Sequence, residues 1–198
     1  GLLPADLVGQ ALASHGDLKA SGNADNYHAE GTIGIGPPGK LAQLALNLDG
    51  TPRQVTLHTL ALKQPQGSLQ ANGTLTLQPT LAWQAEASAD KLDPGQLFAG
   101  WNGALDFNIA SHGKLPKDGP DVTLEIRTLG GKLRGRAIGG HGKLHLAPGN
   151  LLDGRLELAS GGSTVKLSAA AGTSNDAELQ LASASLGDWI PDSGGRLD

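Results

Sequence analysis

The chain has 198 residues, a net charge of −4 and no cysteine. The lack of cysteine excludes disulfides, thiolate chemistry and cysteine-bound zinc. Because lysine and arginine are scattered along the chain, the charge pattern excludes nucleic acid as a partner. No apolar stretch approaches the ~18 residues of a membrane span, and Gly1-Leu2-Leu3-Pro4 is not a signal peptide, so we expect a soluble chain from which any targeting segment has been removed.

Composition and propensity point in different directions. Glycine is abundant, at 30 residues, and aromatic residues make up only 3%. This composition predicts many turns and few large side chains in a core. Leucine and alanine dominate the apolar content, which by propensity alone favours helix. The spacing of the apolar residues therefore has to decide the fold class.

The N-terminal part of the chain shows two local signals. Residues 1–17 are expected to form a short helical or irregular lead-in, with a helical signal from Pro4 to Ala13. Residues 18–198 are expected to form one β-structured segment of a longer repetitive protein. The string from Gly34 to Gly39 has the glycine spacing of a dinucleotide-binding loop, but no helix signal follows it, so a Gly/Pro turn is the better interpretation.

The strongest strand pattern runs from Leu69 to Ala89. Apolar residues occupy its odd positions and polar residues its even positions, with Ala82 as the exception. A two-residue hairpin at Asn72-Gly73 would exchange this parity, and the parity is not exchanged. The sequence therefore predicts one kinked strand from about Ser68 to Gln78, followed by a turn at Gln78-Pro79-Thr80.

Shorter alternating runs occur on both sides of this strand, separated by Gly, Pro and Asn/Asp turns. Asp93 and Pro94 predict a short helix that ends near Phe98, and another helical signal covers Leu186 to Ile190. The expected fold class is all-β, an antiparallel meander with a few short helices. Without a helical layer, the apolar face must be covered by another sheet, by the same sheet curling over, or by a ligand.

Candidate chemical sites are few. His141 and His145 are four residues apart, which on a strand separates them by about 13 Å, so surface histidines are favoured over a metal pair. The other histidines lie singly in polar stretches. Glu86 and Asp90 fall on polar strand positions and Asp93 is a good helix cap, which argues against paired catalytic carboxylates. The sequence therefore predicts no enzyme, no metal and no cofactor.

Short stretches in a fixed order resemble the TamB family of translocation and assembly proteins, which are AsmA-like proteins. The resemblance extends from about Leu18 to the C-terminus. The stretches are Gly67-Ser68-Leu69-Gln70-Ala71-Asn72-Gly73-Thr74-Leu75-Thr76-Leu77, Leu81-Ala82-Trp83-Gln84, Leu92-Asp93-Pro94, Trp101-Asn102-Gly103, Leu129-Gly130-Gly131-Lys132-Leu133-Arg134-Gly135, and Ser185-Leu186-Gly187-Asp188-Trp189-Ile190-Pro191 before Gly194-Gly195-Arg196-Leu197.

This resemblance implies a long protein of Gram-negative bacteria that is anchored in the inner membrane, crosses the periplasm and meets the outer-membrane barrel TamA. The fold it implies is a β-taco, in which a curled antiparallel sheet forms an incompletely closed, barrel-like groove, and the chain is expected to be a middle fragment. The implied function is conduction of phospholipid between the two membranes. The alternative is a scaffold for outer-membrane protein (autotransporter) assembly, in which sheet edges bind TamA or client strands.

The residue pattern supports the first function independently, because acyl chains need only apolar contact of low specificity. We expect the groove to be lined by the apolar members of the alternating runs. They are Leu44, Leu46, Leu48, Leu69, Leu75, Leu77, Leu81, Trp83, Leu105, Phe107, Ile109, Val122, Leu124, Ile126, Leu144, Leu146, Leu156, Leu158, Val165, Leu167, Leu179 and Leu181.

Overall fold

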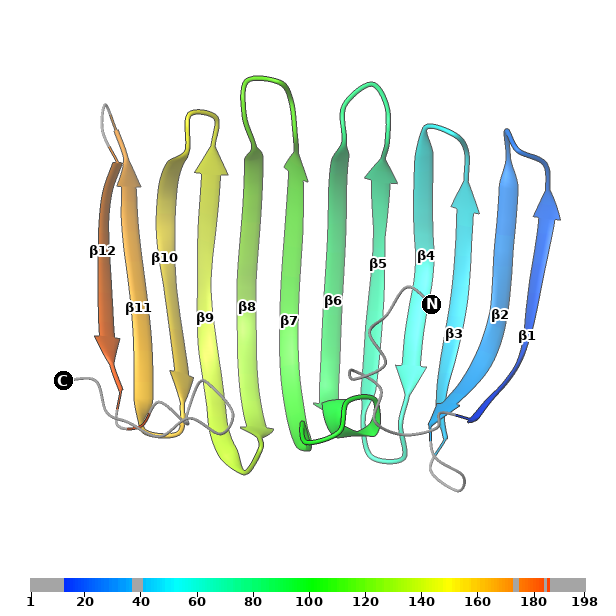
Figure 1. Ribbon diagram of the computed structural model, residues 1–198, viewed down its shortest axis with the longest axis horizontal. Coiled ribbons are helices and arrows are strands. Elements are labelled where there is room, and N and C mark those ends of the chain that lie inside the picture. The colour runs from blue at the N-terminus through cyan, green and yellow to red at the C-terminus, as the bar shows by residue number, and fades with distance from the viewer. Residues whose placement is uncertain (1–12, 37–40, 173–174, 184, 186–198) are drawn as a thin grey trace.

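A computed structural model describes residues 13–36, 41–172, 175–183 and 185. In this part of the chain, 12 strands form one sheet whose spatial order is the chain order, and each strand runs antiparallel to its neighbours (Figure 1). The elements are β1 (Ala13–Gly22), β2 (Tyr27–Gly36), β3 (Ala42–Gly50), β4 (Gln54–Lys63), β5 (Ser68–Thr76), β6 (Ala82–Leu92), the 3-10 helix η2 (Pro94–Gln96), β7 (Gly103–Lys114), β8 (Asp121–Leu133), β9 (Arg136–Ala147), β10 (Leu151–Ser160), β11 (Ser163–Ala171) and β12 (Asn175–Ala182).

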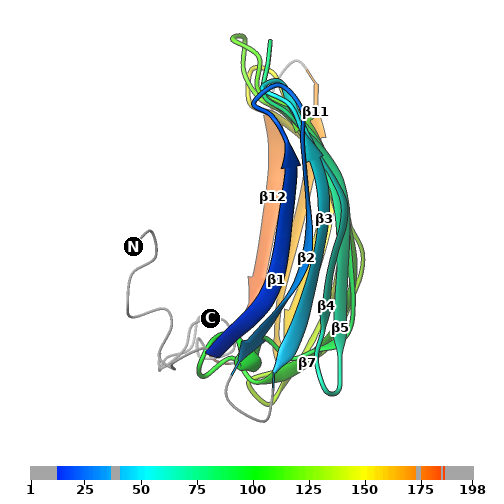
Figure 2. The same ribbon diagram turned by 90° about the vertical axis from the view of Figure 1, so that its right-hand side faces the viewer.

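The sheet is curled and unclosed. Strands β1 and β12 each pair with one neighbour and do not pair with each other. Figure 2 shows that both lie to the same side of the central strands, so the sheet has a concave face, which is the face seen in Figure 1. The predicted all-β class and the curled, open antiparallel sheet of a β-taco are therefore confirmed.

Three strands carry an extra residue relative to their partners. The register shifts near His58 in β4, near Lys91 in β6 and near Arg127 in β8. A bulge of this kind bends its strand and increases the local twist. Together with strand glycines, such bulges let a sheet curl over one of its faces.

Strand β5 follows the parity argument. It runs from Ser68 to Thr76 without a hairpin at Asn72-Gly73. The strand ends two residues earlier than the predicted Gln78, because Leu77 already belongs to the connection to β6. The Leu77 N–H donates to the Arg53 carbonyl over 2.7 Å, so Leu77 continues the alternation of β5 beyond the end of the strand.

The helical predictions have different outcomes. The start at Asp93 is confirmed, although the helix is a single 3-10 turn, Pro94–Gln96, with Asp93 as its N-cap. In the Pro4 to Ala13 signal, only Ala13 is described, and it begins β1. The signal from Leu186 to Ile190 lies outside the described residues.

Candidate functional site

The apolar residues form continuous rows across the strands. Directly opposed residues of an antiparallel pair point to the same face, so the pairing register gives each row. The rows are Tyr27, Gly50, Val55, Leu75, Trp83, Gly113, Val122, Leu146 and Leu152; Ala20, Ala29, Leu48, Leu57, Gly73, Ala85, Ser111, Leu124, Leu144, Gly154, Ala169 and Ala177; Leu18, Gly31, Leu46, Leu60, Ala71, Ala87, Ile109, Ile126, Gly142, Leu156, Leu167 and Leu179; and Ile33, Leu44, Leu62, Leu69, Ala89, Phe107, Leu129, Gly140, Leu158, Val165 and Leu181.

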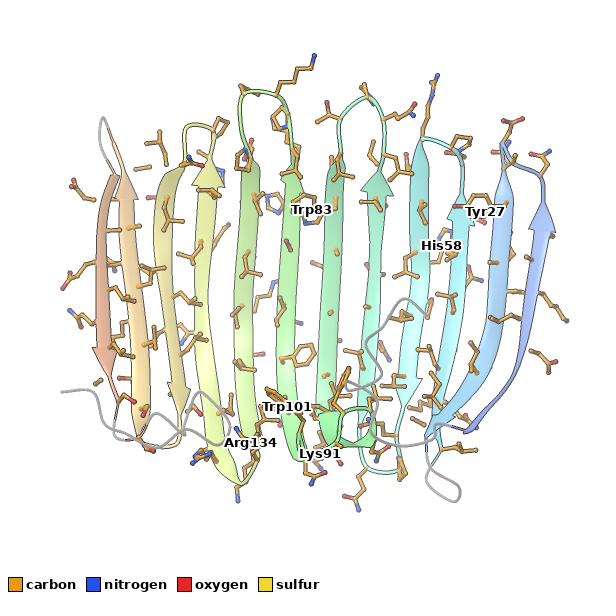
Figure 3. The ribbon with its side chains drawn as sticks, viewed as in Figure 1. Tyr27, His58, Trp83, Lys91, Trp101 and Arg134 are labelled. Atoms are coloured by element: carbon orange, nitrogen blue, oxygen red, sulfur yellow. The ribbon has the colours of Figure 1, made fainter. Side chains whose placement is uncertain are left out.

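All of the residues expected to line a groove lie on this one face. The rows hold all of them except three, which continue the same parity at the ends of the strands. They are Leu77, Leu81, whose carbonyl accepts from the Leu115 N–H, and Leu105, which lies opposite Leu92. The rows occupy the concave face, where Figure 3 shows Trp83 in front of the sheet.

This face has no second layer over it in the described part of the chain. None of the expected lining residues is buried. Leu75 is 38% exposed near the middle strands, and Leu179 is 65% exposed on the edge strand β12. Among the described residues, only two apolar side chains, Ala42 and Leu62, are buried. Within the described residues, the sheet therefore leaves an aliphatic surface uncovered, which monomeric soluble proteins rarely do.

Sequence reasoning missed several members of the same face. Leu57, Leu60 and Leu62 of β4 and Leu129 of β8 belong to the rows. The bulges in β4 and β8 each insert one residue, which shifts the apolar positions from one parity to the other. The sequence signal that could have revealed these residues is a change from odd to even apolar positions, or the reverse, within one strand.

Two aromatic rings of the concave face lie over glycines of the neighbouring strand. A Cβ at Gly50 would collide with the Tyr27 ring, and a Cβ at Gly113 would lie 2.8 Å from Cζ2 of Trp83. The Trp83 Nε1–H donates to Ser111 Oγ over 3.0 Å, which satisfies the only polar atom of the indole. Part of the glycine excess therefore serves the inner face of the sheet, whereas composition alone assigned it to turns.

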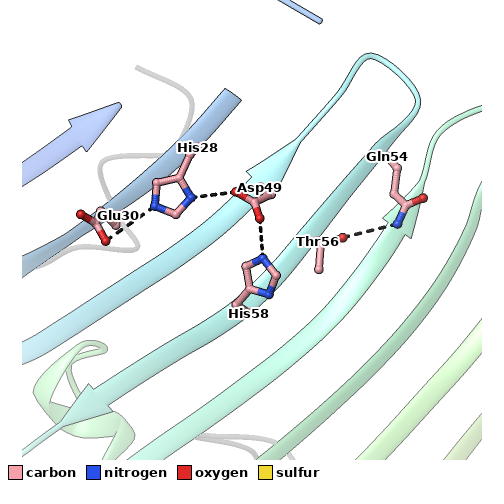
Figure 4. Close-up of polar contacts among 6 residues, drawn as sticks. All are labelled: His28, Glu30, Asp49, Gln54, Thr56 and His58. Carbon is pink, nitrogen blue, oxygen red and sulfur yellow. Dashed lines mark hydrogen bonds and ion pairs between the residues drawn. The ribbon is translucent and has the colours of Figure 1, made fainter. Parts of the chain in front are cut away.

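The opposite, convex face carries a polar cluster that the sequence did not reveal (Figure 4). His28 donates from Nδ1 to Asp49 over 2.7 Å, and His58 donates from Nε2 to the other Asp49 oxygen over 2.7 Å. The bulge in β4 provides the extra residue His58 for this contact. The hydrogen bond to Asp49 raises the pKa of His28, and the bonds from His58 and His28 lower the pKa of Asp49. Histidines that lie singly in the sequence are therefore brought together around Asp49 by the register of β2, β3 and β4.

The remaining candidate groups are also surface contacts between strands. His145 lies 2.9 Å from Asp121, and hydrogen bonds from His145 and then Lys114 lower the pKa of Asp121. Glu86 accepts from Arg127 over 2.9 Å. Among the described residues, no group of three or more His, Asp or Glu side chains is arranged to hold a metal ion. The His145 contact joins the adjacent strands β8 and β9, whereas the Arg127 contact reaches from β8 across β7 to Glu86 of β6. Neither contact forms a nucleophile–base constellation.

Comparison with known families agrees with this architecture. The family model described as TamB, N-terminal domain, matches residues 3–198. The chain belongs to the TamB family. Comparisons with curated proteins and with solved structures give no match.

TamB proteins span the periplasm of the cell envelope as components of translocation and assembly, and the family is not known for enzyme activity. Membership in the TamB family suggests TamA as a partner. No helix in the described residues of this TamB chain is long and apolar enough to cross a membrane.

Proposed function

We propose that the concave face is a groove for phospholipid acyl chains, and that the chain is one segment of a periplasmic path that conducts phospholipid between the inner and outer membranes. The observation that carries the proposal is the set of largely apolar rows, which have no covering layer within the described part of the chain. The proposal includes an inner-membrane anchor in the full-length protein and TamA as the outer-membrane partner.

The dimensions of the face suit acyl chains. Neighbouring strands lie ~4.8 Å apart, so the 12 strands extend over about 53 Å. From Leu77 to Leu69 the apolar positions cover about 27 Å along the strand. The hydrocarbon of one leaflet is about 15 Å thick, so acyl chains fit on the face with room for displacement.

The chemistry of the face suits a ligand that must move. Each buried CH₂ group contributes about 0.8 kcal/mol, whichever leucine it contacts. The rows offer few convergent polar groups that would fix one orientation, and the polar atom of Trp83 is already bonded to Ser111. A ligand can therefore slide from one row to the next at nearly constant free energy.

The test is lipid binding by groove variants. We expect Leu75→Arg, Leu77→Arg or Trp83→Arg to lower the phospholipid that co-purifies with the chain by tenfold or more, because a guanidinium disrupts the apolar contact. Thr74→Arg and Thr76→Arg are matched controls, since these residues alternate with the leucines and point to the convex face. The mass-spectrometric lipid yield and the circular dichroism spectrum are measured together. Folded groove variants that bind lipid and support transport normally in the full-length protein would refute the proposal.

A second candidate function has its own observation. Strands β1 and β12 each leave one edge unpaired in the described sheet and contain no proline, so each edge can accept a further strand. These two unpaired edges support the scaffold role, in which TamA or a client strand binds by β-augmentation. Photocrosslinkers at Lys19 and Glu178, which lie on the edge strands outside the apolar rows, should then yield protein adducts, whereas crosslinkers at Leu75 and Phe107 should yield lipid adducts if the groove function holds.

A further inference from the structure

The two ends of the strands form rims of opposite charge. We define the lower rim, at the bottom of Figure 1, as the described connections at that end with the three strand residues that flank them, and the upper rim likewise at the top. The lower rim has five cationic side chains, Lys63, Lys91, Lys132, Arg134 and Arg136, and two carboxylates, Asp90 and Asp93. The upper rim has three cationic side chains, Arg53, Lys114 and Lys117, and six carboxylates, Asp25, Asp49, Asp118, Asp121, Asp153 and Asp176.

Three of the five cationic side chains of the lower rim are available to a ligand. Lys91, Lys132 and Arg134 form no ion pair within the described part of the chain. One of the two carboxylates, Asp93, is occupied, because its Oδ1 accepts the backbone N–H groups of Gly95 and Gly103 over 3.0 and 2.8 Å. On the upper rim, Lys114 lies 3.3 Å from Asp121 and is already paired.

Two of the few aromatic residues of the chain belong to a connection of the lower rim, and one of them, Trp101, lies beside two of these cations. Phe98 is 45% exposed and Trp101 is 42% exposed, and both belong to the connection that contains η2. Figure 2 shows this green connection on the concave side of the sheet, and Figure 3 shows Trp101 between Lys91 and Arg134 at the lower rim. The Arg134 N–H donates to the carbonyl of Asn102 over 2.7 Å, which brings the arginine next to Trp101.

The connection is held in place by hydrogen bonds. The Gln64 amide pairs with the backbone of Asp93 in both directions, each over 2.8 Å. The start of the connection that carries the aromatic residues is therefore fastened to the turn between β4 and β5. Tryptophan favours a boundary between apolar and polar surroundings because one side of its ring is apolar and its N–H is polar.

We propose that the lower rim binds the phosphate of an anionic phospholipid headgroup whose acyl chains lie on the concave face. The inference rests on the proposed function and adds a direction to it, since every bound lipid would point its headgroup to the lower rim. Lysine and arginine pair with phosphate oxygens, and a net excess of carboxylates makes the upper rim unfavourable for the same group. Each cation near an anionic headgroup raises its affinity about fivefold at low salt.

The experiment measures which lipid the purified chain takes up from vesicles of equimolar phosphatidylglycerol and phosphatidylcholine. We expect a preference for phosphatidylglycerol that weakens between 50 and 500 mM salt, since phosphate contacts are screened. Changing Lys91, Lys132 and Arg134 to Glu should lower the ratio of phosphatidylglycerol to phosphatidylcholine at least tenfold without lowering total bound lipid. The triple change to Gln should lower the ratio less and serves as the second variant if the Glu variant does not fold.

The matched control changes Arg53, Lys114 and Lys117 of the upper rim to Glu, which alters the net charge by the same amount. We expect this control to keep the wild-type ratio. Equal losses in both triple variants, an unchanged ratio in the lower-rim variants, or release of the lipid by equimolar inorganic phosphate would overturn the inference while leaving the groove intact. Wild-type chain that binds no lipid at all would overturn the proposed function and, with it, this inference.

Discussion

The contact between Trp83 and Gly113 allows a sharp test of how the concave face is built. A Cβ at residue 113 would lie 2.8 and 2.9 Å from two ring carbons of Trp83 and 3.0 Å from the Asp121 carbonyl oxygen. Ordinary carbon contacts are about 3.5–4.0 Å, so the indole must move by roughly 1 Å in Gly113→Ala. That displacement strains the 3.0 Å hydrogen bond from Trp83 to Ser111, which contributes about 1 kcal/mol.

Overpacking of this kind costs about 1–3 kcal/mol, so we expect Gly113→Ala to lower the free energy of unfolding by about 2 kcal/mol. Urea titration followed by circular dichroism measures the change, and Trp fluorescence reports the altered indole environment. Gly139→Ala is the matched control, because its Cβ would meet only the Leu129 carbonyl, at 3.9 Å. We expect this control to be neutral or slightly stabilising.

A double-mutant cycle decides the cause. In a Trp83→Ala background the obstructing ring is gone, so Gly113→Ala should cost at least 1 kcal/mol less than in the wild type. If the cost is the same in both backgrounds, the ring does not set the size limit at residue 113, and the packing argument fails.

Three further predictions concern the polar contacts. The pKa of His28 is raised above 6.5, so its contribution to folding stability is complete below about pH 6.5 and is lost as the pH rises through its folded-state pKa. The pKa of Asp49 is lowered below 3.8, so its contribution to folding stability is complete above about pH 3.8 and is lost as the pH falls through its folded-state pKa. Asp49→Asn, which replaces the shared acceptor of His28 and His58, should therefore lower Tm most between pH 4 and 6.5, and an equal loss at pH 9 would contradict this linkage. Gln64→Leu removes both 2.8 Å hydrogen bonds to the Asp93 backbone and should cost about 2 kcal/mol in urea unfolding, with Gln64→Glu retaining part of that stability. Asp93→Ala removes the N-cap and should cost about 1–2 kcal/mol, and a Trp fluorescence spectrum unchanged in that variant would show that the connection does not depend on the cap.

The strands were predictable because their alternation is strong and local. The alternation of apolar and polar positions alone excluded a hairpin at Asn72-Gly73, and in the structure β5 continues through these two residues. The N-cap at Asp93 was readable for the same reason, since a cap depends on residues close in sequence. All expected lining residues share the concave face because parity transfers directly from sequence to sheet.

Other features depend on which residues of neighbouring strands oppose each other, and the sequence alone does not give that register. The pair His28 and Asp49 is 21 residues apart, and only the β2–β3 register brings them together. The bulge that adds His58 to β4 also hid Leu60 from a parity count, because the apolar positions change phase there. The clearance above Gly113 is likewise a property of two strands and not of one.

The strictly sequential strand order has a consequence for how such a sheet can change in length. Because each strand pairs only with its neighbours in the chain, a two-strand hairpin inserted between β8 and β9 would preserve every other pairing, both faces and both rims. Its addition would lengthen the apolar face by about 9.6 Å, two strand spacings, without a new fold. The number of hairpins therefore sets the length of the apolar face that one chain can form.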